Sequence, residues 1–255
     1  MSRTSRRAII SSAGLSHRSA GFQGAQKLSN AGSGRFQGPS GTNAFTSFWV
    51  KLDTIAAATY YSLFDIGPVA SEVMGMRIDG PTGHLVSFKY DQNGVFGTVD
   101  SGFTLLAGQW YQVQGNWGAV VSNTIYDHNG AVVGGGSASP AGDGSYRATA
   151  TPPLSLAARS DTTFPVIGEI DSFAHWRSGN VGAVAGFPAY LANGGKALDY
   201  SGYASGAFSA ATLAFLSTWY NLDEQAGATI WSDQSVNSVP LTAIGTIISQ
   251  PGAGY

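Results

Sequence analysis

Two acidic residues at alternate positions of one segment are the first candidates for chemistry. Glu169 and Asp171 lie in the run GEIDSFAHW, residues 168–176, and if this run is a strand, its alternation places both carboxylates on one face. A retaining glycosidase needs two carboxyl groups about 5 to 5.5 Å apart. The next alternate positions hold Phe173 and His175, so no acid continues the pattern. We interpret the pair as structural and expect that the protein is not an enzyme.

The other residue types that support catalysis or bind metals do not cluster. The histidines are scattered: His17, His84, His128 and His175. The chain has no cysteine, which excludes a thiolate nucleophile, a disulfide and a Cys-ligated zinc site. No glycine-rich loop leads from a strand into a helix with a lysine, so no phosphate-binding loop is indicated. We expect no cofactor, and leave open a calcium ion near Asp65 or Asp127, which lie close to turns.

Aromatic residues are the remaining chemical resource. Trp and Tyr rings can stack on the apolar faces of sugars, while amides and hydroxyls bind the sugar hydroxyl groups. Trp117, next to Asn116, and Tyr146, in a long Gly, Ser, Ala and Pro loop at 134–153, are the rings that we expect to be exposed. A loop of this length is often functional. We therefore predict a glycan-binding site at Trp117, Asn116 and Tyr146.

The charge of the chain is low and unevenly distributed. Only 11% of the 255 residues are charged, against about 25% in an ordinary domain, so hydroxyls and amides must hydrate most of the surface. The segment before Asp53 contains seven of the 13 basic residues and none of the 15 acidic ones. No apolar run reaches the roughly 20 residues of a membrane-spanning helix, and we expect no membrane contact.

Residues 1–43 are predicted to form an extended basic arm, because so few apolar residues cannot bury enough surface to fold alone. Arg3, Arg6, Arg7 and Arg18 could contact the acidic surface of a neighbouring copy or a phosphate backbone. A solvated tail is the alternative. We expect neighbouring protein subunits in a homo-oligomer rather than nucleic acid as the partner.

These residues are positioned by a series of short predicted strands. Residues 44–52, AFTSFWVKL, are bounded by turn residues, and we expect the rest of the chain to pack on this strand. Two hairpins, 84–90 with 95–99 and 124–126 with 131–133, are predicted across Asn-Gly turns, which favour positive φ. Further strands are expected at 60–66, 74–78, 109–117, 154–157, 166–177, 218–222 and 241–248, and short helices at 184–192 and 210–216, the second capped by Ser209.

Five motifs occur in a fixed order along the chain: Phe45–Lys51, Gly108–Val113, Ile125–Asp127 with Gly130, Leu154–Leu156 and Gly168–Phe173. Together they resemble the laminin-G-like domains of the concanavalin A-like lectin and glucanase superfamily over residues 24–200. The resemblance implies an all-β jelly-roll sandwich of two antiparallel sheets in a domain at 44–255, with short helices near the C-terminus. It also implies core positions for Trp49, Trp110 and Trp176.

The resemblance bears on the chemistry and on the C-terminal segment. In the glucanases of this superfamily, acids alternate along one strand and a further Glu follows, which this chain lacks; many relatives bind calcium. Residues 217–255 resemble the opening strands of another such domain. Because the first and last strands of the superfamily lie side by side, we expect this segment to close the same sandwich as a circular permutation, with donation to a neighbouring copy as the alternative.

These observations lead to a hypothesis with one alternative. The first is a non-catalytic structural and interaction protein, a lectin-like jelly roll displayed in a repeating assembly. The virion surface, with the protein as a phage capsid decoration or minor structural protein, is the favoured location. The alternative is a carbohydrate-binding module of a bacterial surface or secreted protein. The two are compatible, because a decoration protein can also bind glycans.

Overall fold

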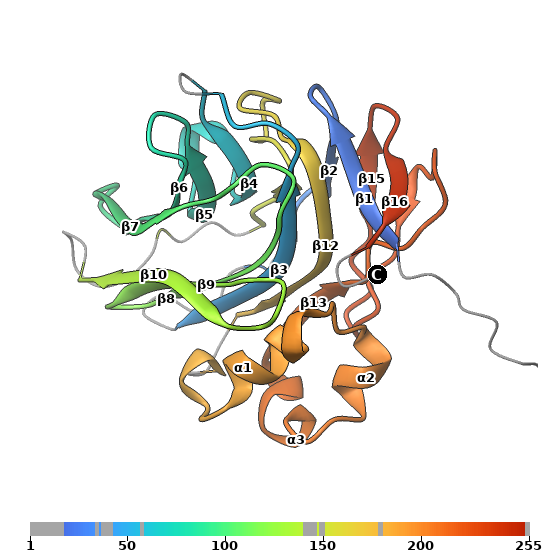
Figure 1. The fold of residues 1–255 in the computed structure, drawn as a ribbon. Helices are drawn as coiled ribbons and strands as arrows, with labels where there is room; N and C mark the ends of the chain where they lie inside the picture. Colours follow the sequence, from blue (N-terminus) through green and yellow to red (C-terminus); the bar gives the residue numbers. More distant parts are fainter. Residues whose placement is uncertain are drawn as a thin grey trace, which may run out of the picture.

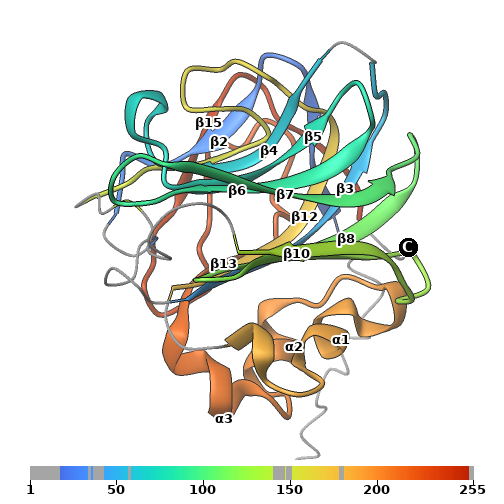
Figure 2. The same ribbon diagram turned by 90° about the vertical axis from the view of Figure 1, so that its left-hand side faces the viewer.

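The computed structural model describes residues 18–33, 36, 43–56, 59–139, 147, 151–177 and 181–252. Its strands form two eight-stranded antiparallel sheets, A and B, packed face to face, and short helices cover the outer face of sheet A (Figures 1 and 2). The predicted jelly-roll sandwich of two antiparallel sheets is confirmed.

Sheet A is centred on β3 (Ala44–Leu52), which has the predicted bounds, and on β12 (Ile167–Trp176). Its strand order is β10-β9-β8-β3-β12-β1-β16, and β13 pairs with β12. Its other strands are β1 (Arg18–Gln23), β8 (Trp110–Trp117), β9 (Val121–Tyr126), β10 (Val132–Ala138), β13 (Leu216–Tyr220) and β16 (Ile248–Pro251).

Sheet B has the strand order β14-β15-β2-β11-β4-β5-β6-β7. Its strands are β2 (Lys27–Ser29), β4 (Tyr61–Ile66), β5 (Met74–Asp79), β6 (His84–Tyr90), β7 (Phe96–Thr104), β11 (Leu154–Leu156), β14 (Ile230–Trp231) and β15 (Leu241–Ile244). Both predicted hairpins are present, as β6–β7 and β9–β10. Their turns place Gly94 at φ 79° and Gly130 at φ 77°, where a side chain would be strained.

Two strands lie within residues 1–43, the segment that the sequence predicts as an extended arm. β1 pairs with β12 and β16, and β2 pairs with β11 and β15. Ala20, Phe22 and Leu28 on these strands are fully or almost fully buried. Each looks isolated in the sequence, but a strand that covers one face of a core needs an apolar residue only at alternate positions.

The C-terminal strands pair within the same chain. β16 lies beside β1 in sheet A, and β15 lies beside β2 in sheet B. The predicted strand 241–248 is two strands, because the chain turns at Gly245, which has φ 81°. Trp231, Leu241 and Ile247 are fully buried, so this segment contributes to the main core.

The centre of the core is a group of aromatic rings between the sheets. Phe64 of β4 lies 5.7 Å from Phe48, 5.6 Å from Trp117 and 5.5 Å from Phe173, as measured between ring centroids, with the ring planes steeply inclined. Such edge-to-face pairs add about 0.5–1.5 kcal/mol each to the effect of burial. Phe64 therefore fixes β4 against three strands of sheet A.

The helical layer has its own apolar core on the outer face of sheet A. Trp176 packs edge-on against Phe187, Tyr203 and Trp219, and Tyr203 stacks on Trp219 at 4.7 Å. The helices are η1 (Val69–Ser71), which lies before β5, and η2 (Val181–Ala183), α1 (Phe187–Ala192), η3 (Asn193–Gly195), α2 (Tyr200–Ala204), α3 (Ser209–Thr212) and η4 (Leu213–Phe215).

The helices differ from the prediction in three ways. α1 begins three residues later than predicted, after Gly186 at φ 80°. α2 was not predicted; it is capped by Asp199, whose carboxylate accepts a bond of 2.7 Å from the Gly202 amide. Ser209 does not cap α3, because its hydroxyl donates to the Gly206 carbonyl instead. In these short segments, local hydrogen bonds decide the ends.

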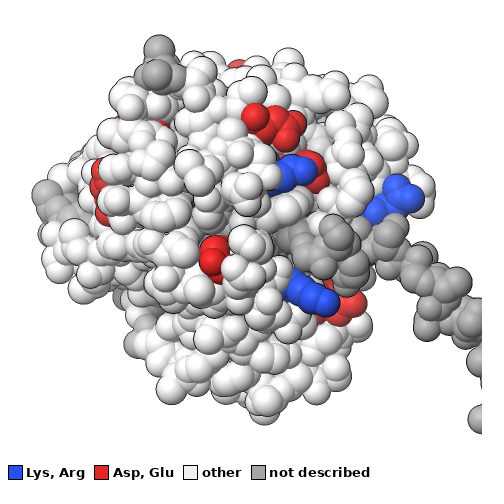
Figure 3. Space-filling model, in the orientation of Figure 1, with Lys and Arg blue, Asp and Glu red and all other residues white. Residues whose placement is uncertain are grey.

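Charged side chains are sparse on the surface, as the composition requires. Figure 3 shows one face on which a few blue and red groups stand among uncharged atoms. Within the described residues, no helix has both the length and the apolar character needed to cross a membrane.

His175 links β12 to β3 and to Phe36 inside the sandwich. Its Nδ1 lies 2.7 Å from the Thr46 hydroxyl and its Nε2 lies 3.2 Å from the Phe36 carbonyl oxygen. A carbonyl can only accept, so Nε2 carries the proton and Nδ1 accepts from Thr46. Burial lowers the pKa of His175 to about 4, because the site disfavours the charged ring.

We expect protonation of His175 to destabilise the fold in acid. Between pH 6.5, the ordinary pKa, and about 4, the unfolded state binds the extra proton, so stability falls as pH falls. Between pH 7.5 and 4.5, wild type should lose roughly 2 to 3 kcal/mol of unfolding free energy relative to His175→Gln. Urea denaturation of both proteins at both pH values measures this, and groups common to both cancel. If the difference in unfolding free energy between wild type and His175→Gln is the same at both pH values, the assignment of His175 as a buried neutral side chain is contradicted.

Candidate functional site

The acidic pair on β12 faces the outer side of sheet A. Glu169 lies opposite Lys51 of β3, and Asp171 lies opposite Trp49. Glu169 forms an ion pair with Lys51 and accepts a bond of 2.6 Å from the Ser19 hydroxyl. The exposed fractions of Glu169 and Asp171 are 6% and 0%, so neither carboxylate is available to a polysaccharide.

The alternation assumed for the rest of this strand is wrong. A β-bulge lies between Asp171 and Ala174 in the pairing with β3, and Ser172 has φ 48°. Phe173 consequently packs in the main core, while Ala174 and Trp176 face the helical layer. A bulge inserts one unpaired residue and shifts the faces of those that follow. The position after Asp171 on the acidic face is therefore occupied by apolar side chains under the helices.

The residues considered for metal binding do not form a site. Among the described residues, no group of three or more His, Asp or Glu side chains could hold a metal ion. Asp127 accepts bonds from the Asn129 and Ala131 amides, which lower the pKa of its carboxyl. Asp65 accepts a bond from Ser62 and is buried. Calcium prefers six to eight oxygen ligands, and these residues do not fit that requirement.

The predicted sugar-binding residues are not brought together. Trp117 is fully buried, and its indole N–H donates to the Phe88 carbonyl of sheet B at 3.0 Å. The expectation that Trp117 is exposed is therefore incorrect. It faces inward because it alternates with Gln114 and Asn116, and Gly115 leaves room for its ring. Tyr146 lies outside the described residues.

Trp49 and Trp176 are core residues, as expected, whereas Trp110 is only partly buried beside Trp49. Arg18 is the first residue of β1, and its guanidinium donates to the Ser249 hydroxyl of β16 at 3.0 Å. Arg3, Arg6 and Arg7 lie outside the described residues.

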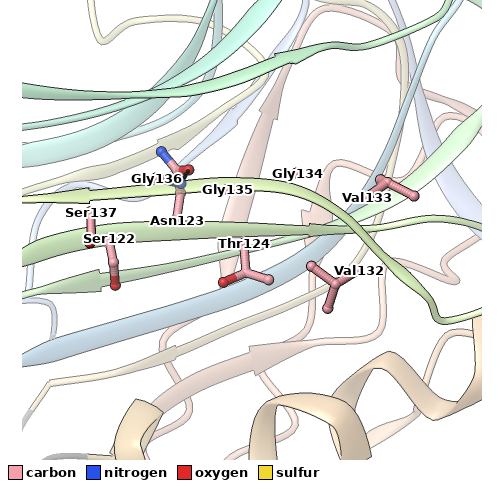
Figure 4. A pocket seen from close by; sticks show the side chains of 9 residues that line it. All are labelled: Ser122, Asn123, Thr124, Val132, Val133, Gly134, Gly135, Gly136 and Ser137. Carbon is pink, nitrogen blue, oxygen red and sulfur yellow. Dashed lines mark hydrogen bonds between the residues drawn. The ribbon is translucent and has the colours of Figure 1, made fainter.

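Asn116 borders a polar groove on the outer face of sheet A, which we call the sheet A groove. Figure 4 shows one part of it, where Ser122, Thr124 and Val132 point toward the helices and Asn123 points into the sandwich. The adjoining part is lined by Phe45, Gln114, Asn116 and Pro188 among others. Of the described lining residues none is charged, and the single ring, Phe45, is 4% exposed. The groove offers hydrogen bonds but no ring face for stacking.

A more enclosed hollow lies on the outer face of sheet B, and we call it the sheet B pocket. Its volume is about 260 Å³. It combines aromatic rings with two carboxyl groups and two guanidinium groups. Its lining residues are Ser62, Asp65, Glu72, Arg77, Phe88, Tyr90, Arg159 and Phe164.

A β-bulge in β4 builds the floor of this pocket. Ser62 lies opposite Arg77 of β5 and Asp65 lies opposite Gly75, with the register shifted between them. Ser62 and Asp65 therefore share one face although they are three residues apart, and the Ser62 hydroxyl donates to Asp65 at 2.6 Å. A Cβ on Gly75 would lie 2.8 Å from both Asp65 Oδ1 and the Phe88 ring. Glycine thus keeps the carboxyl and the ring close together.

In the part of the chain that the structure describes, some charged groups around the pocket have an ion-pair partner and others do not. Burial, together with nearby Glu72, raises the pKa of Asp65 to about 7, against the opposing effects of Ser62, Arg159 and Arg77. Glu72 is held by Arg159, whose Nε and Nη2 each lie 2.8 Å from the Glu72 Oε1 atom. Arg77 lies over ring faces, 5.3 Å from the centroid of Phe88. The Arg77 Nε is buried without a hydrogen-bond partner.

Sequence reasoning did not identify this pocket. From the sequence, Asp65 was considered only as a calcium ligand. None of the other residues that line the pocket was identified as a candidate. One signal was available: Arg77 on β5, and Phe88 and Tyr90 on β6, are large side chains at the solvent-facing positions of two neighbouring strands. Large rings and a cation on that face are unusual where small polar residues would suffice.

Sequence comparison identifies no relative. The sequence matches no protein-family model, and no curated protein matches it. The comparison with solved structures does find similar proteins.

A candidate carbohydrate-binding protein from Bacteroides ovatus is 15% identical, with a TM-score of 0.60, over 92% of this chain and 60% of that one. The LG1–3 region of the laminin α2 chain is 13% identical, with a TM-score of 0.50, over 64% of this chain and 31% of that one. Tailspike protein 2 of an Escherichia coli O157:H7 bacteriophage is 13% identical, also with a TM-score of 0.50, over 78% of this chain and 25% of that one.

The chain spans less than two-thirds of the length of each of these structures. At these identities the likeness concerns the fold. It agrees with the five sequence motifs and with the two-sheet topology. The chain has the jelly-roll fold of laminin G domains and concanavalin A-like lectins.

Proposed function

We propose that this chain is a non-catalytic, lectin-like protein that binds a glycan in the sheet B pocket. The observation that carries the proposal is the composition of that pocket, where ring faces and planar polar groups surround one hollow of about 260 Å³. Sugars are recognised by this combination, since rings stack on their C–H faces and polar groups bind their hydroxyls. The sheet A groove lacks exposed rings and supports the proposal less well.

The residues of the pocket divide into two roles. Tyr90 and Phe164 are partly exposed; Arg147 lies over the Tyr90 ring and Arg159 over the Phe164 ring, and the ring surface that they leave uncovered can contact a sugar. The outer atoms of Arg77 and Arg159 can donate hydrogen bonds to sugar hydroxyls. Neither carboxyl group of the pocket is an exposed, free carboxylate that would serve as a nucleophile, because Glu72 is held by Arg159 and Asp65 is buried, with its pKa raised to about 7. The pair Glu169 and Asp171 is buried on the other sheet, which supports a non-catalytic role.

The fold likeness is consistent with this proposal. The Bacteroides ovatus structure is described as that of a candidate carbohydrate-binding protein. The identity of the sugar is not given by this likeness. A location at a bacterial surface or in secreted form is likewise part of the proposal.

Removing a ring of the pocket should weaken glycan binding. We expect Tyr90→Ala and Phe164→Ala each to lower the affinity for any glycan identified on an array by about tenfold, the effect of one lost stacking contact. Isothermal titration calorimetry measures the affinity. Phe215→Ala, which truncates a ring that is 36% exposed in η4, is the matched control and should bind like wild type. Equal binding by all four proteins, or no glycan bound by wild type, would contradict the proposal.

A second proposal concerns assembly, and it is compatible with the first. Residues before Asp53 hold seven of the 13 bases and no acid, which supports a contact with the acidic surface of neighbouring subunits. We propose that Arg3, Arg6 and Arg7 make this contact in a homo-oligomeric array, with the surface of a virion as the favoured location. The jelly-roll fold occurs in a phage tailspike, but that likeness concerns the fold alone.

The assembly proposal is tested by deleting residues 2–17. A deletion to residue 43 would remove β1 and β2 and unfold the sandwich, so the shorter deletion is required. We expect the truncated protein to keep its thermal midpoint and lose its higher-order species in light scattering. Arg3→Gln, Arg6→Gln and Arg7→Gln combined should act in the same direction. A truncated protein with unchanged mass in solution would exclude this role.

A further inference from the structure

We propose that the glycan bound in the sheet B pocket carries a carboxylate, as a uronic acid does, and that Arg77 pairs with it. The inference deepens the proposed function and rests on it. Three observations support it: the groups that surround Arg77, the contacts that the neighbouring carboxyl groups already make, and the net charge of the hollow that results.

Arg77 is a cation without an anion. Its guanidinium carbon lies 5.4 Å from the ring centroid of Tyr60, 5.3 Å from that of Phe88 and 5.4 Å from that of Phe96. Within the described residues Arg77 forms no ion pair, and its Nε has no hydrogen-bond partner. Rings hold the cation in place but cannot accept its in-plane N–H bonds. Its planar guanidinium group can donate two parallel N–H bonds to the two oxygens of a carboxylate.

The protein's own acids leave Arg77 unsatisfied. Glu72 is already paired with Arg159. Asp65 is buried, with Ser62 donating to one oxygen, and its raised pKa of about 7 keeps it largely neutral below that pH. At mildly acidic pH, the two guanidinium groups that line the hollow therefore face one ionised carboxylate. The hollow holds a surplus positive charge, which a singly charged ligand would balance.

The shape of the pocket favours a sugar acid over a free inorganic anion. The hollow of about 260 Å³ is walled by Phe88, Tyr90 and Phe164 as well as by the charged groups. An inorganic ion has no apolar face to place against those rings, whereas a pyranose does. The carboxylate of a uronic acid extends from such a ring, so one residue can meet both features.

Asp65 makes this affinity depend on pH. The charged and titratable groups that face it are Glu72, Arg77 and Arg159, together with Tyr90 across the pocket and Lys27 of β2. As pH rises through about 7, Asp65 becomes an anion and cancels the surplus charge. The sugar carboxylate, with a pKa near 3.5 as for an α-carboxyl group, stays ionised, so binding should weaken with rising pH.

The test compares matched acidic and neutral sugars by calorimetry at pH 6. The ligands are the methyl glycosides of glucuronic and galacturonic acid, those of glucose and galactose, and a 6-sulfated glucoside. Wild type should bind a uronide at least about tenfold more tightly than its neutral counterpart, the effect of one charge-assisted pair. Arg77→Gln should abolish this preference. Arg18→Gln, which removes an arginine of sheet A, should retain it.

The outcomes separate this inference from the proposed function. Equal affinity of wild type for uronides and neutral glycosides overturns the inference and leaves glycan binding intact. Equal affinity for the uronides and the sulfated glucoside has the same consequence. A wild-type protein that binds no sugar here and no glycan on an array overturns both. If Arg77→Gln unfolds at a lower temperature than wild type, Arg77→Lys, which keeps the charge without the planar guanidinium group, should still reduce the preference.

A second measurement addresses the pH dependence. From pH 6 to pH 8, wild type should lose about tenfold in uronide affinity, because a new charge arises within a few ångströms of the ligand. Asp65→Asn, which keeps an acceptor for Ser62, should bind the uronide with the same affinity at both pH values. A wild-type affinity that does not change with pH, or one that rises, contradicts the role of Asp65.

Discussion

The position of Phe64 between the two sheets is the constraint on which the rest of the structure depends. Its ring meets Phe48, Trp117 and Phe173, so β4 cannot slide or turn over without emptying the centre of the core. From Phe64 onward, past the bulge, β4 alternates, and a slip by one residue would exchange its two faces. With Phe64 inward, Asp65 must point outward. Core packing thus sets the direction of Asp65, and side chains on the outer face of sheet B bury it.

The outer faces of the two sheets are covered to different extents. On sheet A, the helical layer packs on Trp176 and Trp219, and the acids beneath it are buried or neutralised by Lys51. On sheet B, no helix of the described chain lies over β5 and β6 (Figure 2). A hollow remains there, and Glu72, Arg77 and Arg159 border it.

The sequence was informative where the structure follows local rules. β3 and the two Asn-Gly hairpins depend on alternation and on glycine turns, and both patterns are visible in one stretch of chain. Trp117 and the bulges in β4 and β12 depend on what lies opposite. Bulges change the face of every following residue and leave no mark in the periodicity. The sheet B pocket joins residues 62–65, 72–77, 88–90 and 159–164, so it could not be recognised before the strands were paired.

Unpaired buried polar atoms occur at several places in the described chain, among them Arg77 Nε at the sheet B pocket and Asn116 Oδ1 at the sheet A groove. The indole nitrogens of Trp49 and Trp219 also lack partners, but they border a cavity of about 10 Å³, close to the room that one water needs. Arg77 instead borders a hollow many times larger. An unsatisfied buried donor costs about 1–3 kcal/mol, and keeping a carboxyl neutral at pH 7 adds to that cost. Folding does not require either cost at that position, because neutral residues could cover the outer face of sheet B. These two costs support the proposal that a ligand binds in the pocket.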